Sequence, residues 1–237
     1  MSVQKFQQSK QVSLMHLQGE KTMKINLGEH ITVVGITGTG KTYFSRNALL
    51  PVFQRVLVID TEEYDFEDFP IVKQSSIGQL VKTDYRFAAK VVLSPEDTEE
   101  IEDICLTLLK HGHDMVVYID EITDFSDAHR IPKMLKALIR KARKRKISVV
   151  VGTQRPQMLN LDFLANSMHN IYFFMSERDA DYIASYEPRI FDNLGAIPYQ
   201  SYQSIYIGPD RAMMVFAPAE EYDWSKRLKY KRGLINV

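Results

Sequence analysis

The chain has little cysteine and no excess charge of either sign. Its 237 residues include a single cysteine, Cys105, so no disulfide can form within the chain, and a reducing compartment is the expected setting. Lysine and arginine total 30, as do aspartate and glutamate, so the overall charge does not indicate a polyanionic partner. Cys105 shares helical spacing with the apolar residues Ile101, Ile104, Leu108 and Leu109. This spacing predicts a core position for Cys105.

The sequence also lacks long apolar segments, internal repeats and low-complexity linkers. Every apolar run is far shorter than the ~20 residues that a membrane-spanning helix needs. The polar start MSVQKFQQSKQ does not resemble a signal peptide. We therefore expect a soluble protein with an irregular or β-rich segment over residues 1–28 and a single domain over residues 29–237.

Charged residues are nevertheless distributed unevenly. Two acidic stretches, DTEEYDFEDF (60–69) and PEDTEEIED (95–103), are expected to be solvated faces. A basic stretch precedes the apolar run ISVVV and the sequence GTQRP (152–156). It holds eight cations and no acid between residues 133 and 146: Lys133, Lys136, Arg140, Lys141, Arg143, Lys144, Arg145 and Lys146.

Short apolar segments alternate with helical patterns from residue 29 onward. Helices are predicted from Ser94, as N-cap, to about Lys110, and over roughly Ile131–Lys146. QSIYIG (203–208) and RAMMVF (211–216) predict a β-hairpin at the sheet edge. Alternating strands and helices indicate an α/β fold with a mainly parallel sheet. The strands are predicted at Ile31–Val34, Arg55–Ile59, Lys90–Leu93, Met115–Ile119, Ser148–Val151 and Ile171–Phe174.

The segment GITGTGKT (35–42) matches G-x-x-x-x-G-K-[ST] in full, between a predicted strand and a helical stretch. Its glycines allow backbone N–H groups to surround phosphates, and the helix N-terminus adds partial positive charge. Lys41 is expected to reach the β- and γ-phosphates, and Thr42 to ligate Mg²⁺. The predicted nucleotide-binding residues are Gly35, Thr37, Gly38, Thr39, Gly40, Lys41 and Thr42.

Two acids follow the apolar strand in MVVYIDE (115–121). Asp120 at the strand end can hold Mg²⁺, and Glu121 can orient and polarise a water for attack on the γ-phosphate. Alone, this pattern is more typical of a strand that runs into an acidic turn; the phosphate loop reverses that preference and favours the catalytic interpretation. No N-K-x-D guanine motif is present, and a second acid favours hydrolysis over transfer to a nucleoside.

Gln154 follows the strand predicted at Ser148–Val151. Ligands of parallel sheets bind beyond the carboxyl ends of the strands, so Gln154 lies near the γ-phosphate if its strand neighbours the phosphate loop. A capped strand end explains Thr, Gln and Pro equally well. The aromatic residues of 172–216 are expected in the core and edge strands, and nothing in the sequence positions them for base stacking.

The stretch KARKRKISVVVGTQRP (141–156) resembles the corresponding segment of the HerA/FtsK superfamily of DNA-pumping ATPases. VLVIDTEEY (56–64) and FLANSMHNIYFF (163–174) are similar to two further segments of that superfamily, and the resemblance spans roughly residues 30–208. Two departures are clear. Lys146 stands where many relatives have glycine, and no arginine lies near His169-Asn170, so no sensor is assigned there.

The resemblance implies a RecA-like P-loop core with helices on both faces of the sheet and a C-terminal hairpin at its edge. It implies ATP and Mg²⁺ as cofactors and a homo-oligomer, expected to be a hexameric ring, with nucleotide at subunit interfaces. Arg143 takes the arginine-finger position, with Arg140 and Arg145 as rivals. The catalytic set is then Glu121, Gln154 and Arg143, and the metal set Thr42 and Asp120.

The length most resembles packaging ATPases of tailless icosahedral viruses, which often contain a membrane. Double-stranded DNA is then the expected partner, together with a capsid or portal-vertex protein, in the host cytoplasm or at the virion packaging vertex. Two alternatives stay open. One is a filamentous-phage assembly or conjugation ATPase of the same superfamily, and the other is a nucleotide-binding structural or adaptor protein without turnover.

Overall fold

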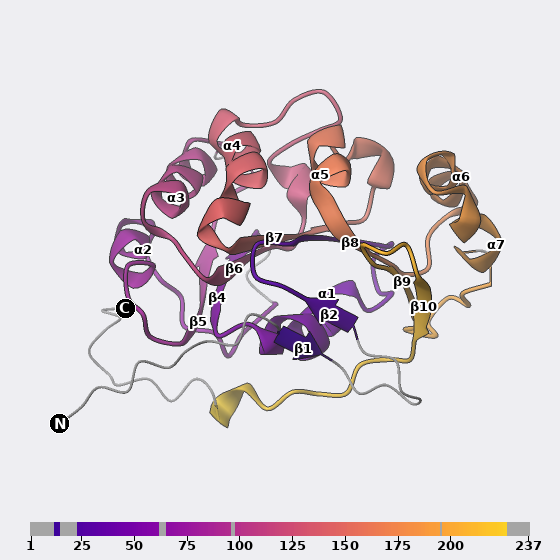
Figure 1. Cartoon of the computed structure of the whole chain (residues 1–237), viewed down its shortest axis with the longest axis horizontal. Helices are drawn as coiled ribbons and strands as arrows, with labels where there is room; N and C mark the ends of the chain where they lie inside the picture. The colour runs from indigo at the N-terminus through magenta and orange to yellow at the C-terminus, as the bar shows by residue number, and fades with distance from the viewer. Residues whose placement is uncertain (1–11, 15–22, 62–64, 96–97, 195, 227–237) are drawn as a thin grey trace.

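A computed structural model describes residues 12–14, 23–61, 65–95, 98–194 and 196–226 (Figure 1). Its centre is an eight-stranded sheet in the order β10-β9-β8-β3-β7-β6-β4-β5. The six strands from β8 to β5 are parallel, whereas β9 and β10 pair antiparallel at one edge. The bounds are β3 His30–Val34, β4 Arg55–Asp60, β5 Phe87–Val92, β6 Met115–Ile119, β7 Ile147–Thr153, β8 Ser167–Tyr172, β9 Ser204–Ile207 and β10 Met213–Phe216.

Helices cover both faces of the sheet, so the predicted α/β architecture is confirmed (Figure 1). One face carries α2 (Gln74–Leu80), α3 (Thr98–His111), α4 (Lys133–Lys141) and α5 (Leu161–Asn166). The other carries α1 (Lys41–Phe44), which continues as a π turn (Ser45–Leu49) and a 3₁₀ turn (Leu50–Val52). Beside the hairpin edge lie α6 (Glu177–Tyr186) and α7 (Phe191–Leu194).

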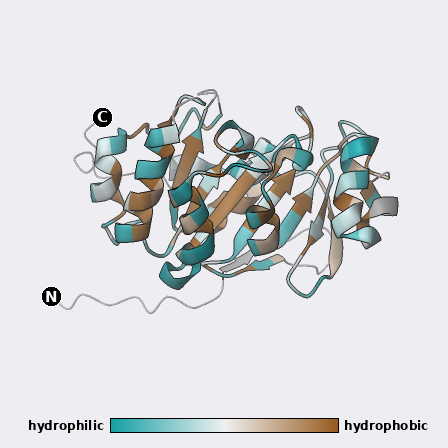
Figure 2. Ribbon diagram, turned by 90° about the horizontal axis from the view of Figure 1, so that it is seen from above, coloured by the Kyte–Doolittle hydropathy of each residue, from teal (hydrophilic) through white to brown (hydrophobic). Residues whose placement is uncertain are grey.

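The parallel strands are buried on both faces, as their continuous apolar sequences predict. Leu57, Val117 and Val149 point toward α2–α5, and Cys105 is buried in this layer as predicted. Val58 and Val116 point to the opposite layer, where they meet Phe44 of α1. Figure 2 shows the apolar strands enclosed by helices whose outer surfaces are hydrophilic.

The six predicted parallel strands all exist, and the hairpin is confirmed as β9 and β10. Strand β8 was predicted at the wrong place, however: it spans Ser167–Tyr172 rather than Ile171–Phe174. Pairing of Thr32 with Asn170 and of Val34 with Tyr172 fixes β8 along β3. Strand pairing therefore extends into polar residues that hydrophobicity alone does not identify as a strand.

The predicted helix Ile131–Lys146 was too long at both ends. The structure has α4 over Lys133–Lys141, followed by a 3₁₀ turn over Ala142–Arg145. The Glu102 carboxylate accepts the N–H groups of Lys133 and Met134 at 2.7 and 2.6 Å, which fixes the start. At the other end Lys146 has a left-handed backbone, φ 55°, which ends the helical segment.

The helix predicted from Ser94 begins at Thr98, so Ser94 is not its N-cap; residues 96 and 97 lie outside the described part of the chain. Within the predicted segment 1–28, β1 (Val12–Leu14) pairs antiparallel with β2 (Met23–Ile25). Met23 and Ile25 pack in the same layer as Phe44. The division at residue 28 stays a prediction.

Candidate nucleotide site

The segment 35–42 connects the carboxyl end of β3 to the start of α1. Gly35 donates its N–H to the Thr153 carbonyl of β7, and Ile36 donates to the Phe174 carbonyl beyond β8, both at 3.2 Å. Both neighbouring strands therefore anchor the loop. Gly40 has φ 98°, which favours glycine, and a Cβ there would also lie 3.0 Å from the Tyr202 ring.

The loop's cation folds back across the loop. The Lys41 ammonium donates to the Ile36 carbonyl at 3.2 Å, and the Thr39 hydroxyl donates to the same carbonyl at 2.7 Å. Lys41 and Thr39 are buried, whereas Thr37 and Gly38 are exposed. The loop thus presents an open backbone surface with its single ammonium group beneath it.

Asp120 lies directly after β6 and faces the end of the loop. Its Oδ1 accepts a 3.1 Å hydrogen bond from the Thr42 hydroxyl and a second one from the Tyr118 hydroxyl. Burial raises the pKa of Asp120, and it raises that of Tyr118 well above its ordinary value. The strand therefore holds a carboxylate, poorly solvated, beside the first turn of α1.

Thr42 and Asp120 fit a magnesium ion. Both offer hard oxygen atoms, and Mg²⁺ is usually held by one or two carboxylates together with water and phosphate oxygens. Among the described residues no cluster of three or more His, Cys, Asp or Glu side chains is positioned for a metal. A site with only two protein ligands therefore suits Mg²⁺ better than a metal that requires a cage of protein ligands.

Glu121 is held in place by three donors from two segments. Its Oε1 accepts from the Thr123 hydroxyl at 2.5 Å and from the Thr123 N–H at 3.4 Å, and its Oε2 accepts from the Gln154 N–H at 2.9 Å. Burial raises the pKa of Glu121, which is the direction expected of a group that accepts a proton near neutral pH.

Gln154 lies at the loop, as the sequence predicted on the condition that β7 neighbours β3. The two strands do pair, from Ile31 with Val150 to Val34 with Thr153. The Thr37 hydroxyl donates to the Gln154 side-chain oxygen at 2.5 Å. The structure therefore brings Lys41, Thr42, Asp120, Glu121 and Gln154 together from three separate stretches of sequence.

Three supporting residues were missed in the sequence. Tyr118, Thr123 and Gly152 hold the two acids: the first two through hydrogen bonds, and Gly152 because β7 there passes close to the Asp120 backbone. Tyr118 did leave a signal, since it is the one polar side chain inside the apolar strand MVVYI. Gly152 left none, because its reason is a contact between strands.

No family model matches the chain. A curated relative, Protein P9 of Pseudoalteromonas phage PM2, is 33% identical over 138 residues. The match covers 55% of this chain and 62% of the relative, so the chain spans less than two thirds of the relative's length.

Solved structures resemble the whole fold. The genome-packaging NTPase B204 of Sulfolobus turreted icosahedral virus 2, in complex with sulfate, superposes with a TM-score of 0.69 at 18% identity, covering 84% of this chain and all of that one. VirB4 of Thermoanaerobacter pseudethanolicus gives 0.60 at 11% identity, covering 92% and 99%. The pCW3 conjugation coupling protein TcpA, with ATPγS, gives 0.57 at 17%, covering 93% and 68%.

The chain has the fold of the P-loop ATPases. The resemblance predicted from the sequence is therefore confirmed at the level of the fold. Position 35–42 is the phosphate-loop position of that fold, between the first parallel strand and the first helix. No helix of the described residues is long and apolar enough to cross a membrane.

Arg143 does not join the other predicted site residues within the chain. It precedes β7, so it lies at the amino edge of the parallel sheet, whereas the loop lies at the carboxyl edge. The side chain is exposed, and its Nε donates to the Gly28 carbonyl at 3.4 Å. A role for Arg143 at a phosphate therefore requires the phosphate of another subunit.

The rival arginines are held by their own surroundings. Arg140 donates to the Asp162 carboxylate of α5 through two nitrogens, at 2.5 and 3.0 Å. Arg145 donates to the Gly112 carbonyl at 3.5 Å. Of the three, Arg140 has the strongest competing partner, and this ranks it below Arg143 as a residue that reaches outward.

Proposed function

We propose that the chain is an ATP hydrolase that moves double-stranded DNA, and that it packages a viral genome. One observation carries the hydrolase proposal: the hydrogen bonds Thr42–Asp120, Thr37–Gln154 and Gln154–Glu121 join two acids and an amide to a phosphate-loop sequence. A loop that only bound nucleotide would not need Glu121.

Each residue has a distinct task in this proposal. The backbone of 35–40 surrounds the phosphates, and Lys41 moves from the Ile36 carbonyl to them. Thr42 and Asp120 hold Mg²⁺, which neutralises charge on the phosphates when bound. Glu121 accepts the proton of the attacking water, while Gln154 exchanges its bond with Thr37 for one to the γ-phosphate or the water.

The proposal that hydrolysis moves DNA is supported by the similarity of the fold to that of B204. B204 is named as a genome-packaging NTPase, and it has been solved with the ATP analogues AMPPCP and ATPγS. The basic stretch 133–146 offers phosphate contacts, although Lys136 and Arg140 are paired with Asp162. A capsid or portal-vertex protein is the further partner of this proposal, with action in the host cytoplasm or at the packaging vertex.

A ring, expected to be hexameric, would complete the site. In such a ring Arg143 of one subunit stabilises transition-state charge at the phosphate loop of its neighbour. Its exposed position at the amino edge of the sheet supports a role between subunits, because its own phosphate loop lies at the opposite, carboxyl edge.

The rival functions share much of this geometry. TcpA and VirB4 have the same fold at lower TM-scores than B204, so conjugation or filament assembly is the second candidate. A nucleotide-binding adaptor is less consistent with a half-buried Glu121 whose pKa is raised.

Hydrolysis by the purified chain, with and without linear double-stranded DNA, tests the proposal. We expect ATP turnover that double-stranded DNA increases, together with displacement of a third strand from a triplex by a moving protein. Lys41→Ala should bind no nucleotide, since the loop loses its point charge. A wild-type chain that binds ATP without turnover, alone and with DNA, would establish the adaptor instead.

A further inference from the structure

We propose that Tyr202 and Tyr199 form a stacking subsite for the base of the nucleotide. The inference rests on the proposed function, because it takes the segment 35–42 to hold the phosphates. It adds a recognition element that the phosphate-loop sequence does not contain. Both tyrosines belong to the segment Ala196–Gln203, which follows α7 and leads into β9.

Tyr202 packs directly on the end of the phosphate loop. A Cβ placed on Gly40 would lie 3.0 Å from Tyr202 Cδ1 and 3.6 Å from Tyr202 Cβ. Gly40 immediately precedes Lys41, the first residue of α1. The ring therefore stands beside the helix N-terminus at which phosphates bind.

Tyr199 lies near a second glycine of the loop, Gly38. Its hydroxyl lies 3.9 Å from the position of a Cβ on Gly38, and its ring packs against Phe174 with centroids 5.2 Å apart. Phe174 in turn accepts the Ile36 N–H at its carbonyl. Tyr199 thus lies beside the phosphate loop because it packs on Phe174, the residue whose carbonyl anchors the loop.

Exposure alone does not set these two rings apart, since Tyr186 of α6 is 53% exposed; their position beside the phosphate loop does. Tyr172, Phe173, Tyr206 and Phe216 are buried, as the sequence predicted for this region. Tyr199 and Tyr202 are 52% and 49% exposed, and they lie beside Gly38 and Gly40 of the loop. Each ring therefore keeps about half of its surface open to solvent beside the loop.

The backbone conformation of this segment indicates that the place of the Tyr202 ring is specified by its surroundings. Gln200 and Tyr202 both have left-handed backbones, with φ 61° and 55°. This conformation is uncommon for residues other than glycine and is unfavourable for a bulky side chain. Strain of this kind is found where the surroundings, or a ligand, require a particular side-chain placement.

The chemistry that suits these rings is a planar base. Ribose and base are covalently attached to the phosphates on the loop, so they must lie close to it. Every nucleobase has a π face, and stacking on one aromatic ring is worth about a tenfold to hundredfold change in affinity. Stacking alone does not select a base, so we expect the subsite to accept ATP and GTP similarly.

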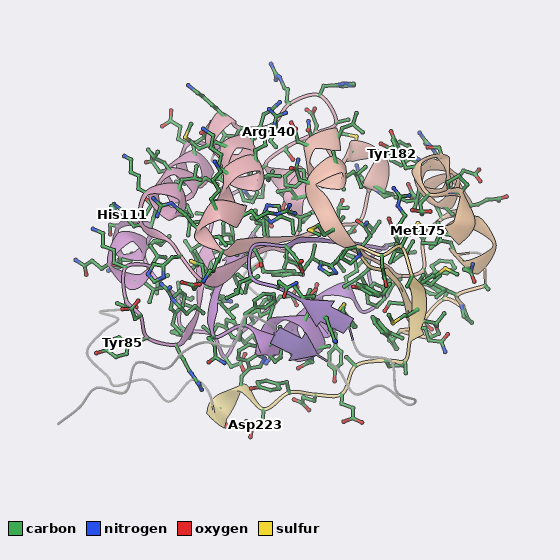
Figure 3. All side chains as sticks on the ribbon, in the orientation of Figure 1. Tyr85, His111, Arg140, Met175, Tyr182 and Asp223 are labelled. Carbon is green, nitrogen blue, oxygen red and sulfur yellow. The ribbon has the colours of Figure 1, made fainter. Side chains whose placement is uncertain are left out.

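Comparing two ligands with the same phosphates tests the subsite. Affinities of Mg·ATP and Mg·tripolyphosphate are measured by calorimetry for wild type, Tyr202→Ala and Tyr202→Phe. We expect Tyr202→Ala to weaken ATP about tenfold and to leave tripolyphosphate unchanged, and Tyr202→Phe to behave as wild type. The matched control is Tyr85→Ala: Tyr85 is 66% exposed, and Figure 3 shows it across the molecule from Met175, which follows β8. It should change neither affinity.

The outcomes separate this inference from the proposed function. If Tyr202→Ala weakens both ligands equally, Tyr202 supports the phosphate loop; if it tightens both, Tyr202 covers the loop. If ATP affinity is unchanged, Tyr202 does not stack on the base. Each of these results overturns the subsite and leaves the phosphate loop as proposed. A wild type that binds neither ligand overturns both. If Tyr202→Ala does not fold, Tyr199→Ala carries the same comparison, with the same selective loss expected.

Discussion

A Cβ on Gly152 of β7 would lie 2.0 Å from the carbonyl oxygen of Asp120. Strand β7 and the residue after β6 approach this closely only because residue 152 has no side chain. Gly152 is buried and its neighbour here is backbone, so no side chain can move aside to make room. The position of the acidic pair relative to Gln154 depends on that approach.

Gly152→Ala should therefore both destabilise the protein and lower hydrolysis. Overpacking in a well-packed interior costs about 1–3 kcal/mol, and separation of β6 from β7 would move Glu121 away from the Gln154 N–H. Thermal unfolding and ATP turnover are the measurements. Gly78→Ala in α2 is the matched control: its Cβ would meet Thr107 at 3.6 Å, an ordinary contact, and alanine favours helix by about 1 kcal/mol. Wild-type behaviour of Gly152→Ala would contradict the close approach.

Glu121→Gln should bind Mg·ATP with near wild-type affinity and hydrolyse it very slowly. The amide keeps the shape of the side chain but has no basicity, whereas Asp120 and Thr42 are unchanged. Single-turnover hydrolysis and nucleotide binding are measured together. Glu99→Gln, an exposed substitution on α3, should keep wild-type turnover. Turnover of Glu121→Gln within a few-fold of wild type would assign the base to another acid.

Asp120→Asn should make the ligand-free protein more stable at neutral pH. Burial raises the pKa of Asp120, so the folded state retains a proton that the unfolded state releases. The ionised carboxylate therefore destabilises the folded state above its folded pKa, and this cost vanishes below the unfolded pKa near ~4.

The melting temperature of Asp120→Asn relative to wild type, measured in EDTA, should thus rise between pH 4.5 and 7.5. Mg·ATP should reverse the order, because ligand binding stabilises only a protein that can hold it. A variant that is less stable than wild type at pH 7.5 in EDTA would show that the Tyr118 and Thr42 hydrogen bonds outweigh desolvation.

Arg143→Ala should bind ATP normally and lose about a thousandfold or more in hydrolysis if Arg143 acts as a finger. Arg140→Ala serves as the comparison, since its guanidinium is occupied by Asp162 and its loss should have a smaller effect on turnover.

Mixing Arg143→Ala with Lys41→Ala subunits decides whether the arginine acts between subunits. Each variant should be inactive alone, but some interfaces of a mixed ring would join an intact loop to an intact Arg143. Activity should partly return in proportion to those interfaces. Co-assembled rings without any recovery would leave the basic stretch as a solvated or DNA-contacting helix.

The parts of the site that the sequence predicted are those whose chemistry lies within one stretch. The phosphate loop needs only residues 35–42, and Asp120 and Glu121 need only the strand before them. Gln154 was conditional on strand order, which sequence spacing does not contain; the pairing of β7 with β3 supplied it. Fold class followed from buried strands that alternate with helices.

The parts that could not be predicted depend on partners elsewhere in the chain. The start of α4 is set by Glu102 on α3, and the limits of β8 by its pairing with β3. Tyr202 reaches Gly40 across 162 positions of sequence, and aromatic content alone gave no sign of it. Contacts of this kind become visible only once the fold brings the segments together.

Strand β7 also defines a mechanical relationship. Its seven residues span roughly 20 Å, with Arg143 in the 3₁₀ turn before one end and Gln154 directly after the other. The strand is buried throughout and hydrogen-bonded on both sides by β3 and β6, so it has little freedom to bend or stretch. We expect the strand to move as a rigid unit. If Gln154 shifts when the nucleotide at the phosphate loop changes, the basic segment that contains Arg143 should shift by a similar amount.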